Sequence, residues 1–250
     1  MQAYLTLVRR ELGSYFISLT GYVVIAGVLL LMGASLVLLL ESLNGQPVDV
    51  PVMELFYETQ FFWLILLLAT PLITMRSFAH EKFAGTYETL MTTPVSDAQV
   101  VLAKFTGTMV FYLLAWVPLL TYPALLRHYS TDPLAVDAGP VGSTFLGIFL
   151  LGMLYIAMGC FASSLTRSQI LAATNAFALG ICLFMASFLT RILPLREGWQ
   201  TKALTHISII EHMRDFVRGI VDTRHIVFYV SLTAFFLFLT LKVVEARRWR

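Results

Sequence analysis

The stretch AHEKFAGTYETLMTTPVS, residues 79–96, is a short polar segment between two long apolar runs. It carries two isolated carboxylates, Glu81 and Glu88, together with Gly85 and Pro94. Glycine can end a helix in the left-handed conformation, whereas proline cannot continue a helix. We therefore expect short helical pieces separated by bends, forming an elbow that joins the two apolar runs.

The composition of the whole chain is typical of an integral membrane protein. The 250 residues are 58% hydrophobic and only 13% charged, whereas soluble domains are about 25% charged. The mean hydropathy is +0.79. The net charge is only +2, and the basic residues stand at the ends of the apolar runs and not in one stripe. Neither feature indicates a nucleic-acid partner. Cys160 and Cys182 lie inside apolar runs without metal-ligand spacing, so we expect free thiols and no metal or cofactor.

Six apolar runs are long enough to cross a membrane as helices. About 20 residues at roughly 1.5 Å each span a hydrocarbon core of about 30 Å. The predicted spans are residues 21–40, 59–75, 105–126, 142–163, 170–190 and 226–244. The fold class is therefore all-α, with residues 1–250 forming one transmembrane domain.

The first 20 residues favour an amphipathic helix on the membrane surface. Arg9, Arg10 and Glu11 interrupt apolar residues at helical spacing. A signal peptide is the alternative, but the apolar run 21–40 has full spanning length and no clear cleavage site, so we expect an uncleaved helix. The short loops 41–58 and 127–141 hold a single basic residue, Arg127, which predicts that both termini are cytoplasmic. The longer loop 191–225 is on the outer side in this orientation although it holds six basic residues, so it does not fit the rule.

Two spans carry packing signals. In the fifth span, small residues recur every four positions and form a smooth ridge for close contact with another helix: Ser168, Ala172, Ala176 and Gly180. In the third span, Pro118 and Pro123 each remove a backbone donor, which predicts a kink in its outer half.

The elbow, residues 76–104, can be divided further. We expect residues 76–83 to extend span two and Gly85 to end that helix. Thr86 is a suitable N-cap for a second short helix ending near Thr92, which Pro94 follows. The sequence Ser-Asp-Ala-Gln at 96–99 is a capping box and predicts the start of the helix that becomes span three.

A second amphipathic helix is predicted over residues 208–219, on the outer side before span six. Ser208 and Glu211 form a capping box, and Gly219 is a C-terminal stop. The apolar face comprises Ile209, Ile210, Met213, Phe216 and Val217, opposite Glu211, His212, Arg214, Asp215 and Arg218. This helix could lie at the lipid interface, enter the membrane as half of a hairpin, or contact an external partner. We expect His212 to be solvated and not a metal ligand.

Signatures of self-powered transport and of catalysis are missing from the sequence. No ionisable residue lies deep within a predicted span, which disfavours an ion-coupled carrier. His80-Glu81 begins like a zinc-protease motif, but Ala84 stands where the second histidine is required. The chain also has no phosphate loop and no nucleophile-elbow motif, so directed work requires energy from another protein.

The elbow resembles that of the permease subunits of type-2 ABC transporters, particularly the gliding-motility and copper-site-maturation permeases. The shared pattern is an acidic residue, Gly-Thr-x-Glu-x-Leu, Pro-Val and a lysine-bearing helix. The matching residues are Glu81, Gly85, Thr86, Glu88, Leu90, Pro94, Val95 and Lys104. The sequence departs from the pattern at Phe83-Ala84, where a basic residue is frequent, and at Met91, where a second leucine is frequent.

The resemblance implies a permease in a prokaryotic inner membrane, with the elbow as coupling helix. Two cytoplasmic ABC ATPase subunits and a second permease, identical or related, would complete the complex, and the resemblance implies that it serves export. The resemblance assigns polar contacts with the ATPase to Glu81 and Glu88 and apolar contacts to Tyr87, Leu90 and Met91. The two carboxylates could instead be solvated helix charges. A membrane scaffold that moves no substrate, and less favourably a secondary carrier, are the alternative functions.

Overall fold

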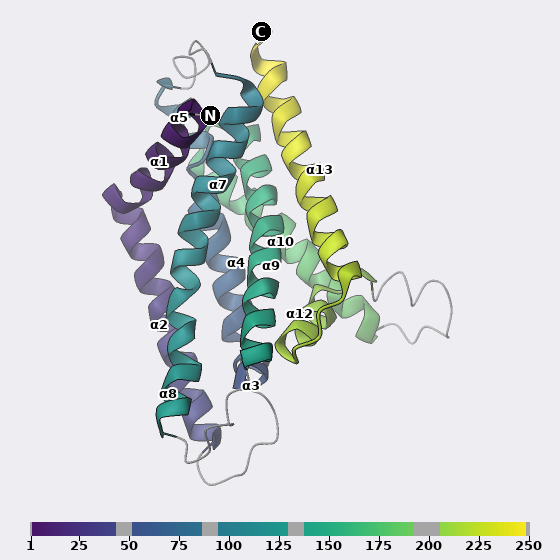
Figure 1. Cartoon of the computed structure of the whole chain (residues 1–250). Coiled ribbons are helices and arrows are strands. Elements are labelled where there is room, and N and C mark those ends of the chain that lie inside the picture. Colours follow the sequence, from purple (N-terminus) through teal and green to yellow (C-terminus); the bar gives the residue numbers. More distant parts are fainter. Residues whose placement is uncertain (1, 44–51, 87–94, 130–137, 193–205, 249–250) are drawn as a thin grey trace.

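The computed structural model describes residues 2–43, 52–86, 95–129, 138–192 and 206–248. These residues form helices joined by turns, and no strand occurs within these ranges. The helices are α1 (Gln2–Ile17), α2 (Leu19–Leu43), α3 (Val52–Glu58), α4 (Phe61–Thr74), α5 (Ala79–Phe83), α7 (Asp97–Trp116), the 3₁₀ turn η1 (Val117–Leu120), α8 (Thr121–Tyr129), α9 (Ala138–Leu165), α10 (Gln169–Ile192), α12 (Ile209–Val217) and α13 (Thr223–Arg248) (Figure 1).

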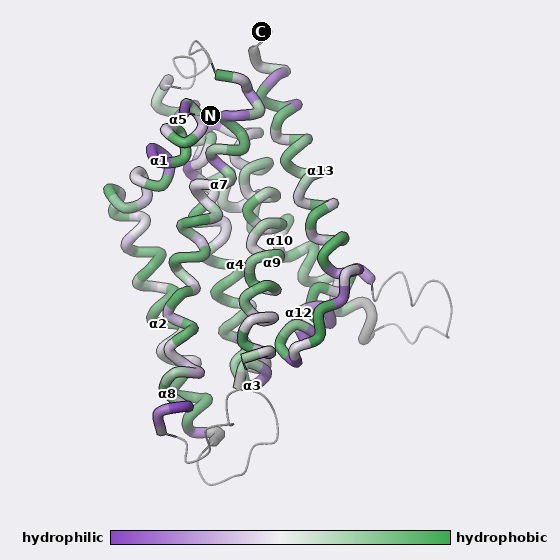
Figure 2. The backbone as a smooth tube through the Cα atoms, in the orientation of Figure 1, coloured by the Kyte–Doolittle hydropathy of each residue, from purple (hydrophilic) through white to green (hydrophobic). Residues whose placement is uncertain are grey.

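Six helical segments of the described chain are long and apolar enough to cross a membrane. They are Leu19–Glu41, Phe61–Phe83, Asp97–Leu125, Ala138–Leu165, Gln169–Phe188 and Thr223–Ala246. Each overlaps one of the six predicted spans, and Figure 2 shows hydrophobic residues along their length. The chain is therefore an all-α, multi-pass membrane protein.

The two ends of the bundle carry different elements. The N- and C-termini and α5 lie together at one end, which we call the elbow end, and α3 and α8 lie at the opposite, far end (Figure 1). An even number of membrane crossings places both termini at the same end, as observed here. The cytoplasmic position of the elbow end stays a prediction.

Helix α9 is the centre of the bundle and packs against α4, α7, α10, α12 and α13. Its glycines allow close approach of large or branched neighbours. A Cβ atom at Gly152 would lie 2.2 Å from Tyr112 Cε1, and one at Gly159 would lie 2.2 Å from Thr74 Oγ1. Both distances are far below van der Waals contact, so α7 and α4 could not pack at these positions against any larger residue.

The small-residue ridge of α10 faces α9. Ala172 and Ala176 are buried. A Cβ atom at Gly180 would lie 2.9 Å from Tyr155 Cε1 of α9, and the Tyr155 hydroxyl donates to the Gly180 carbonyl at 3.2 Å. Ser168 lies at the start of the same helix, where its hydroxyl accepts from the Leu171 N–H. This ridge is thus occupied by a neighbouring helix of the same chain.

The third span is broken as its prolines predict. Helix α7 ends at Trp116, the chain makes the 3₁₀ turn η1 with Pro118 in its first positions, and α8 begins at Thr121. The α-helix is thus interrupted at the first of the two predicted prolines, and the kink itself stays a prediction.

The structure adds a helix that the sequence analysis treated as loop. Residues 52–58, within the predicted outer loop 41–58, form α3. Met53, Phe56 and Tyr57 occupy positions i, i+3 and i+4 and are all buried. Their burial against the bundle stabilises a helix too short to form alone.

Helix α1 packs on the protein as well as presenting apolar residues outward. Its Tyr15 ring stacks on Phe111 of α7 with centroids 4.6 Å apart. The Tyr15 hydroxyl donates to the Ile73 carbonyl at 3.2 Å and lies 3.0 Å from Thr108 Oγ1. Leu5, Phe16 and Ile17 are exposed. The expected surface helix is therefore fastened to α4 and α7.

Candidate functional site

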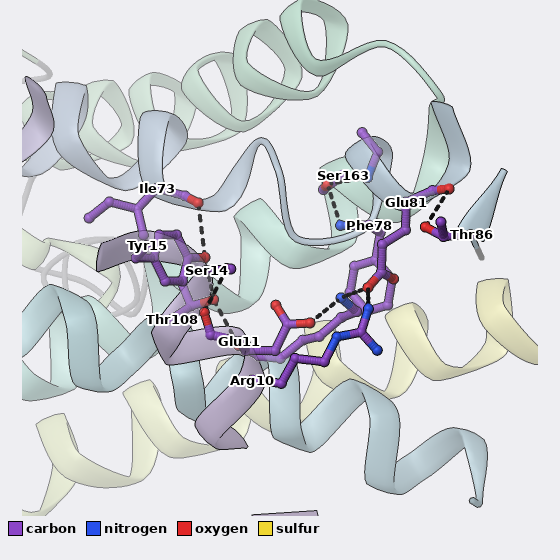
Figure 3. A network of polar contacts seen from close by, with 12 residues as sticks. Arg10, Glu11, Ser14, Tyr15, Ile73, Phe78, Glu81, Thr86, Thr108 and Ser163 are labelled. Atoms are coloured by element: carbon purple, nitrogen blue, oxygen red, sulfur yellow. Dashed lines mark hydrogen bonds and ion pairs between the residues drawn. The ribbon is translucent and has the colours of Figure 1, made fainter. Parts of the chain in front are cut away.

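The elbow begins with a break and not with the expected continuation of span two. Helix α4 ends at Thr74, the chain turns, and α5 begins after Phe78, whose φ of −121° is non-helical. Ser163 of α9 replaces the missing helical hydrogen bonds. Its hydroxyl accepts from the N–H groups of Phe78 and Ala79, both at 3.1 Å, and donates to the Met75 carbonyl at 3.2 Å (Figure 3). The prediction of one continuous helix over residues 76–83 was wrong because this side chain stabilises the bend.

Helix α5 is also attached to the turn between α9 and α10. The Lys82 ammonium donates to the Ser164 carbonyl at the end of α9. Gln169 Nε2, at the start of α10, lies 3.0 Å from His80 Nδ1. The short helix therefore has polar contacts with both helices of this hairpin.

The end of α5 has the geometry that the glycine predicts. Gly85 adopts φ +72°, in the left-handed region, after the Ala84 N–H has bonded the His80 carbonyl at 2.9 Å. Thr86 Oγ1 donates to the Glu81 carbonyl at 3.5 Å (Figure 3). Gly85 and Thr86 are exposed, so the elbow reaches the protein surface here.

Much of the predicted contact surface lies outside the described residues. This applies to the expected second helix and to Tyr87, Glu88, Leu90, Met91 and Pro94. The description resumes at Val95, and the capping box at the start of α7 is confirmed. Ser96 Oγ accepts from the Gln99 N–H, and Gln99 Oε1 accepts from the Ser96 N–H, both at 3.3 Å.

Glu81 is held in a cluster of charges that joins three helices. Its Oε1 atom lies 3.0 Å from Lys104 Nζ of α7 and 3.5 Å from Arg10 Nη2 of α1. Lys104 Nζ also lies 2.7 Å from Glu11 Oε1 of α1. We call Arg10, Glu11, Glu81 and Lys104 the elbow cluster; Figure 3 shows Arg10, Glu11 and Glu81 converging.

Glu81 and Lys104 of the elbow cluster are buried, and the four formal charges of the cluster cancel. Lys104 is 2% exposed and Glu81 is 8% exposed. A buried ammonium is costly unless carboxylates compensate it, and here two carboxylates do so. Glu81 is therefore not the solvated helix charge that we considered as an alternative. Its direct contact with a partner protein stays a prediction.

Arg10 and Glu11 were not predicted as partners of Glu81 and Lys104, although the sequence contains one usable signal. Lys104 stands between Ala103 and Phe105, and its neighbours Val100, Val101 and Ala103 are buried. A lysine on an apolar helix face requires a carboxylate in contact. The identity of that carboxylate depends on the packing of α1 against α7, which sequence spacing does not reveal.

The predicted outer helix exists and ends as expected. Ser208 Oγ accepts from the Glu211 N–H at 3.5 Å, and Gly219 adopts φ +87°. The Ile220 N–H bonds the Asp215 carbonyl at 2.9 Å and the Gly219 N–H bonds the Phe216 carbonyl at 3.1 Å. These two bonds form a Schellman motif that terminates α12.

Helix α12 packs on its own chain. Its predicted apolar residues Ile209, Ile210, Met213, Phe216 and Val217 are all buried. The Tyr57 hydroxyl of α3 donates to the Ile210 carbonyl at 2.7 Å, and Arg218 Nη2 lies 2.6 Å from Glu54 Oε1. Contacts within the protein thus cover the apolar face.

His212 was predicted to be solvated, and this was wrong. Its side chain is 1% exposed, and its ring stacks on His225 of α13 with centroids 4.0 Å apart. The start of α13 folds back over α12 after the Gly219 turn and covers the ring. The histidines, aspartates and other acidic or thiol groups of the described residues form no group suited to hold a metal ion.

The fold and the elbow define a class: a multi-pass membrane protein with a short, anchored polar helix, α5, at one end of its bundle. The family model described as ABC-2 family transporter protein matches residues 52–208, more than half of the chain. The chain belongs to this family. It is accordingly the non-catalytic membrane component, or permease, of an ABC transporter and works with an ABC ATPase. A comparison with curated proteins found no match.

Proposed function

We propose that this permease exports its substrate across a prokaryotic cytoplasmic membrane by using ATP hydrolysis on a separate cytoplasmic subunit. The elbow, residues 76–104, is the coupling segment, and both termini face the cytoplasm. Two ATPase copies and a second permease, identical or related, complete the complex. The Gly85-Thr86-x-Glu88-x-Leu90 pattern supports placing the chain near the gliding-motility and copper-site-maturation permeases.

The attachment of α5 is the observation that carries this proposal. The elbow cluster links α5 to α1 and α7, and Ser163 and Lys82 link it to α9. A small helix held by buried polar contacts to several helices cannot move far without them, because separating the charges would leave them buried and unpaired. A force on the elbow is therefore transmitted to the bundle.

The individual residues have separate tasks in this proposal. Glu88 makes the polar contact with the ATPase, and Tyr87, Leu90 and Met91 supply the apolar contact. Gly85, Thr86 and Pro94 shape the bends that present these residues. Glu81 makes the second polar contact with the ATPase, and its ion pair with Lys104 fixes the angle at which the elbow leaves the bundle.

Copurification tests the proposal at the level of the complex. Residues 85–95 are replaced by a Gly-Ser sequence of equal length, and a second variant has residues 130–137 replaced in the same way. We expect the ATPase subunit to be lost from the first variant and retained by the second. Retention of the ATPase by both variants would contradict the coupling role. An intact complex that moves no substrate in an ATP-dependent way would indicate the scaffold instead.

A further inference from the structure

Helix α12 separates two cavities toward the far end of the bundle. One cavity of about 850 Å³ is bordered by aromatic side chains, among them Trp63 and Phe184, and by Ile210 and Arg214 of α12. The other, of about 420 Å³, is bordered by His212 and Asp215 of the same helix and by His225 of α13. Ile210 and Arg214 are four residues apart and share one face, whereas His212 lies about 200° away from Ile210 around the helix. A movement of α12 away from α13 would therefore alter the wall of the larger cavity.

The contact between α12 and α13 consists of stacked and edge-on rings and of a polar pair, Asp215 Oδ2 and His225 Nε2, 3.0 Å apart. The His212 ring stacks on His225 at an interplanar angle of 30°. It meets the rings of Phe228 and Tyr229 edge-on, with centroids 5.2 Å and 5.6 Å away. His206 lies 6.3 Å away on another side. The histidine at the centre of this contact is enclosed by apolar ring surface and by two further imidazoles.

Neither ring nitrogen of His212 has a hydrogen-bond partner of regular geometry among the described residues. A contact with the His206 backbone favours the charged ring, but it is outweighed by burial. A buried imidazole in this condition is favoured in its neutral form, because burial removes the water that would solvate a charged ring. Burial, followed by the neighbouring His225 and His206, lowers the pKa of His212 to about 3. The native packing thus excludes the protonated state that a released histidine adopts below pH 6.5.

Of the charges around His212, Asp222 favours a proton on the ring, whereas His225 and His206 oppose it. The titratable or charged groups around it are His206 before α12, Glu211, Arg214 and Asp215 in α12, Asp222 in the turn, and Arg224, His225 and Tyr229 in α13.

Each carboxylate of this group has a partner other than His212. Asp215 Oδ2 lies 3.0 Å from His225 Nε2, and Glu211 lies 3.2 Å from Arg214. Asp222 accepts from the Arg224 N–H at 2.8 Å, which lowers the pKa of the Asp222 carboxyl and keeps it charged in mild acid. Asp222 favours a proton on His212 in the packed site, but burial and the neighbouring His225 and His206 outweigh it.

We infer that the contact between α12 and α13 is an acid-released latch: protonation of His212 frees α12 from α13 and moves the Ile210–Arg214 wall of the larger cavity. The inference rests on the proposed function in one respect only, the interpretation of the larger cavity as part of a transport route. The latch itself follows from the stacking of His212 on His225 and from the unpaired ring nitrogens.

Hydrogen exchange of the full-length chain in lipid nanodiscs, without ATPase, tests the latch. Exchange rates are corrected for the intrinsic effect of pH, and peptides covering Glu211–Val217 are compared with core peptides of α9. We expect the opening constant of α12 to rise about 30-fold from pH 7.5 to pH 5 while the α9 peptides keep theirs, since a histidine with an ordinary pKa gains a proton on release. An unchanged α12, or equal acceleration of α9, would overturn the inference.

Two variants identify the proton acceptor. His212→Phe keeps a ring of similar size without a titratable nitrogen, and we expect it to abolish the acid response of α12. His128→Phe, in α8 at the far end, is the matched control and should keep the response. Acid release that persists in His212→Phe would overturn the role of this residue. Should that variant fail to fold, the wild-type comparison of α12 with α9 decides the matter. These measurements require no transport, so a failed coupling experiment leaves them unaffected.

Discussion

The protein buries two polar clusters, and they differ in how their charge is balanced. In the elbow cluster, Lys104 lies within 3.0 Å of carboxylate oxygens from Glu11 and Glu81. Around His212, the rings stack without a hydrogen bond to either of its nitrogens among the described residues. The first arrangement holds three helices together through opposite charges. The second joins two helices through a histidine whose charged form is disfavoured by burial. Burial alone therefore does not determine how a polar cluster behaves.

The largest effect is expected from removing the cation of the elbow cluster. Lys104→Met leaves two buried carboxylates, compensated only by Arg10, whose side chain is 55% exposed. We expect a loss of about 3–5 kcal/mol in the free energy of unfolding, measured by denaturation in detergent. The triple variant Lys104→Met, Glu11→Gln, Glu81→Gln removes the charges together and should recover much of this loss. Equal destabilisation of both variants would contradict the charge balance described here.

The dependence of stability on pH separates the two clusters. His212 has a pKa of about 3 when folded, against 6.5 in a free chain, so the unfolded state binds more protons between these values. Stability should therefore fall as the pH drops below 6.5, by about 2 kcal/mol at pH 5. His212→Phe should remove this part of the acid loss in denaturation curves recorded at pH 7.5 and pH 5. A slope identical to that of the wild type would contradict it.

A smaller effect is expected at the bend before α5. Ser163→Ala removes the acceptor of the Phe78 and Ala79 N–H groups. Loss of such a cap costs about 1–2 kcal/mol, and we expect faster hydrogen exchange confined to residues 76–83. Ser143→Ala provides a control in the same helix, because Ser143 contacts α12 and not the elbow. Uniform destabilisation by both variants would argue against a local role for Ser163.

Local signals predicted local structure well. The length of the apolar runs predicted the six spans, Ser96 and Gln99 predicted the start of α7, and Gly85 and Gly219 predicted two helix ends with positive φ. In each case the cause lies within a few residues of the feature. The same holds for the break that Pro118 introduces.

Contacts between distant segments could not be predicted from the sequence alone. Glu11 and Lys104 are separated by 93 positions, and nothing in their spacing indicates that α1 lies on α7. His212 was assigned to the polar face of its helix, but that face is covered by α13, whose return path depends on the Gly219 turn. Ser163 caps the elbow only because Gly159 lets α9 approach α4. The Glu11–Lys104 pair, the burial of His212 and the cap by Ser163 all depend on tertiary packing.

The most direct test of the coupling role is charge reversal at Glu88. The complex with its ATPase is purified with wild-type permease, with Glu88→Lys and with Glu245→Lys, a control near the end of α13. Coupling is measured as the stimulation of ATPase activity by the permease. Expression and membrane insertion are measured for the same variants. We expect Glu88→Lys to lower this stimulation with expression and insertion intact, and Glu245→Lys to leave all three unchanged. Undiminished stimulation with Glu88→Lys would contradict the assignment of the elbow as the coupling segment.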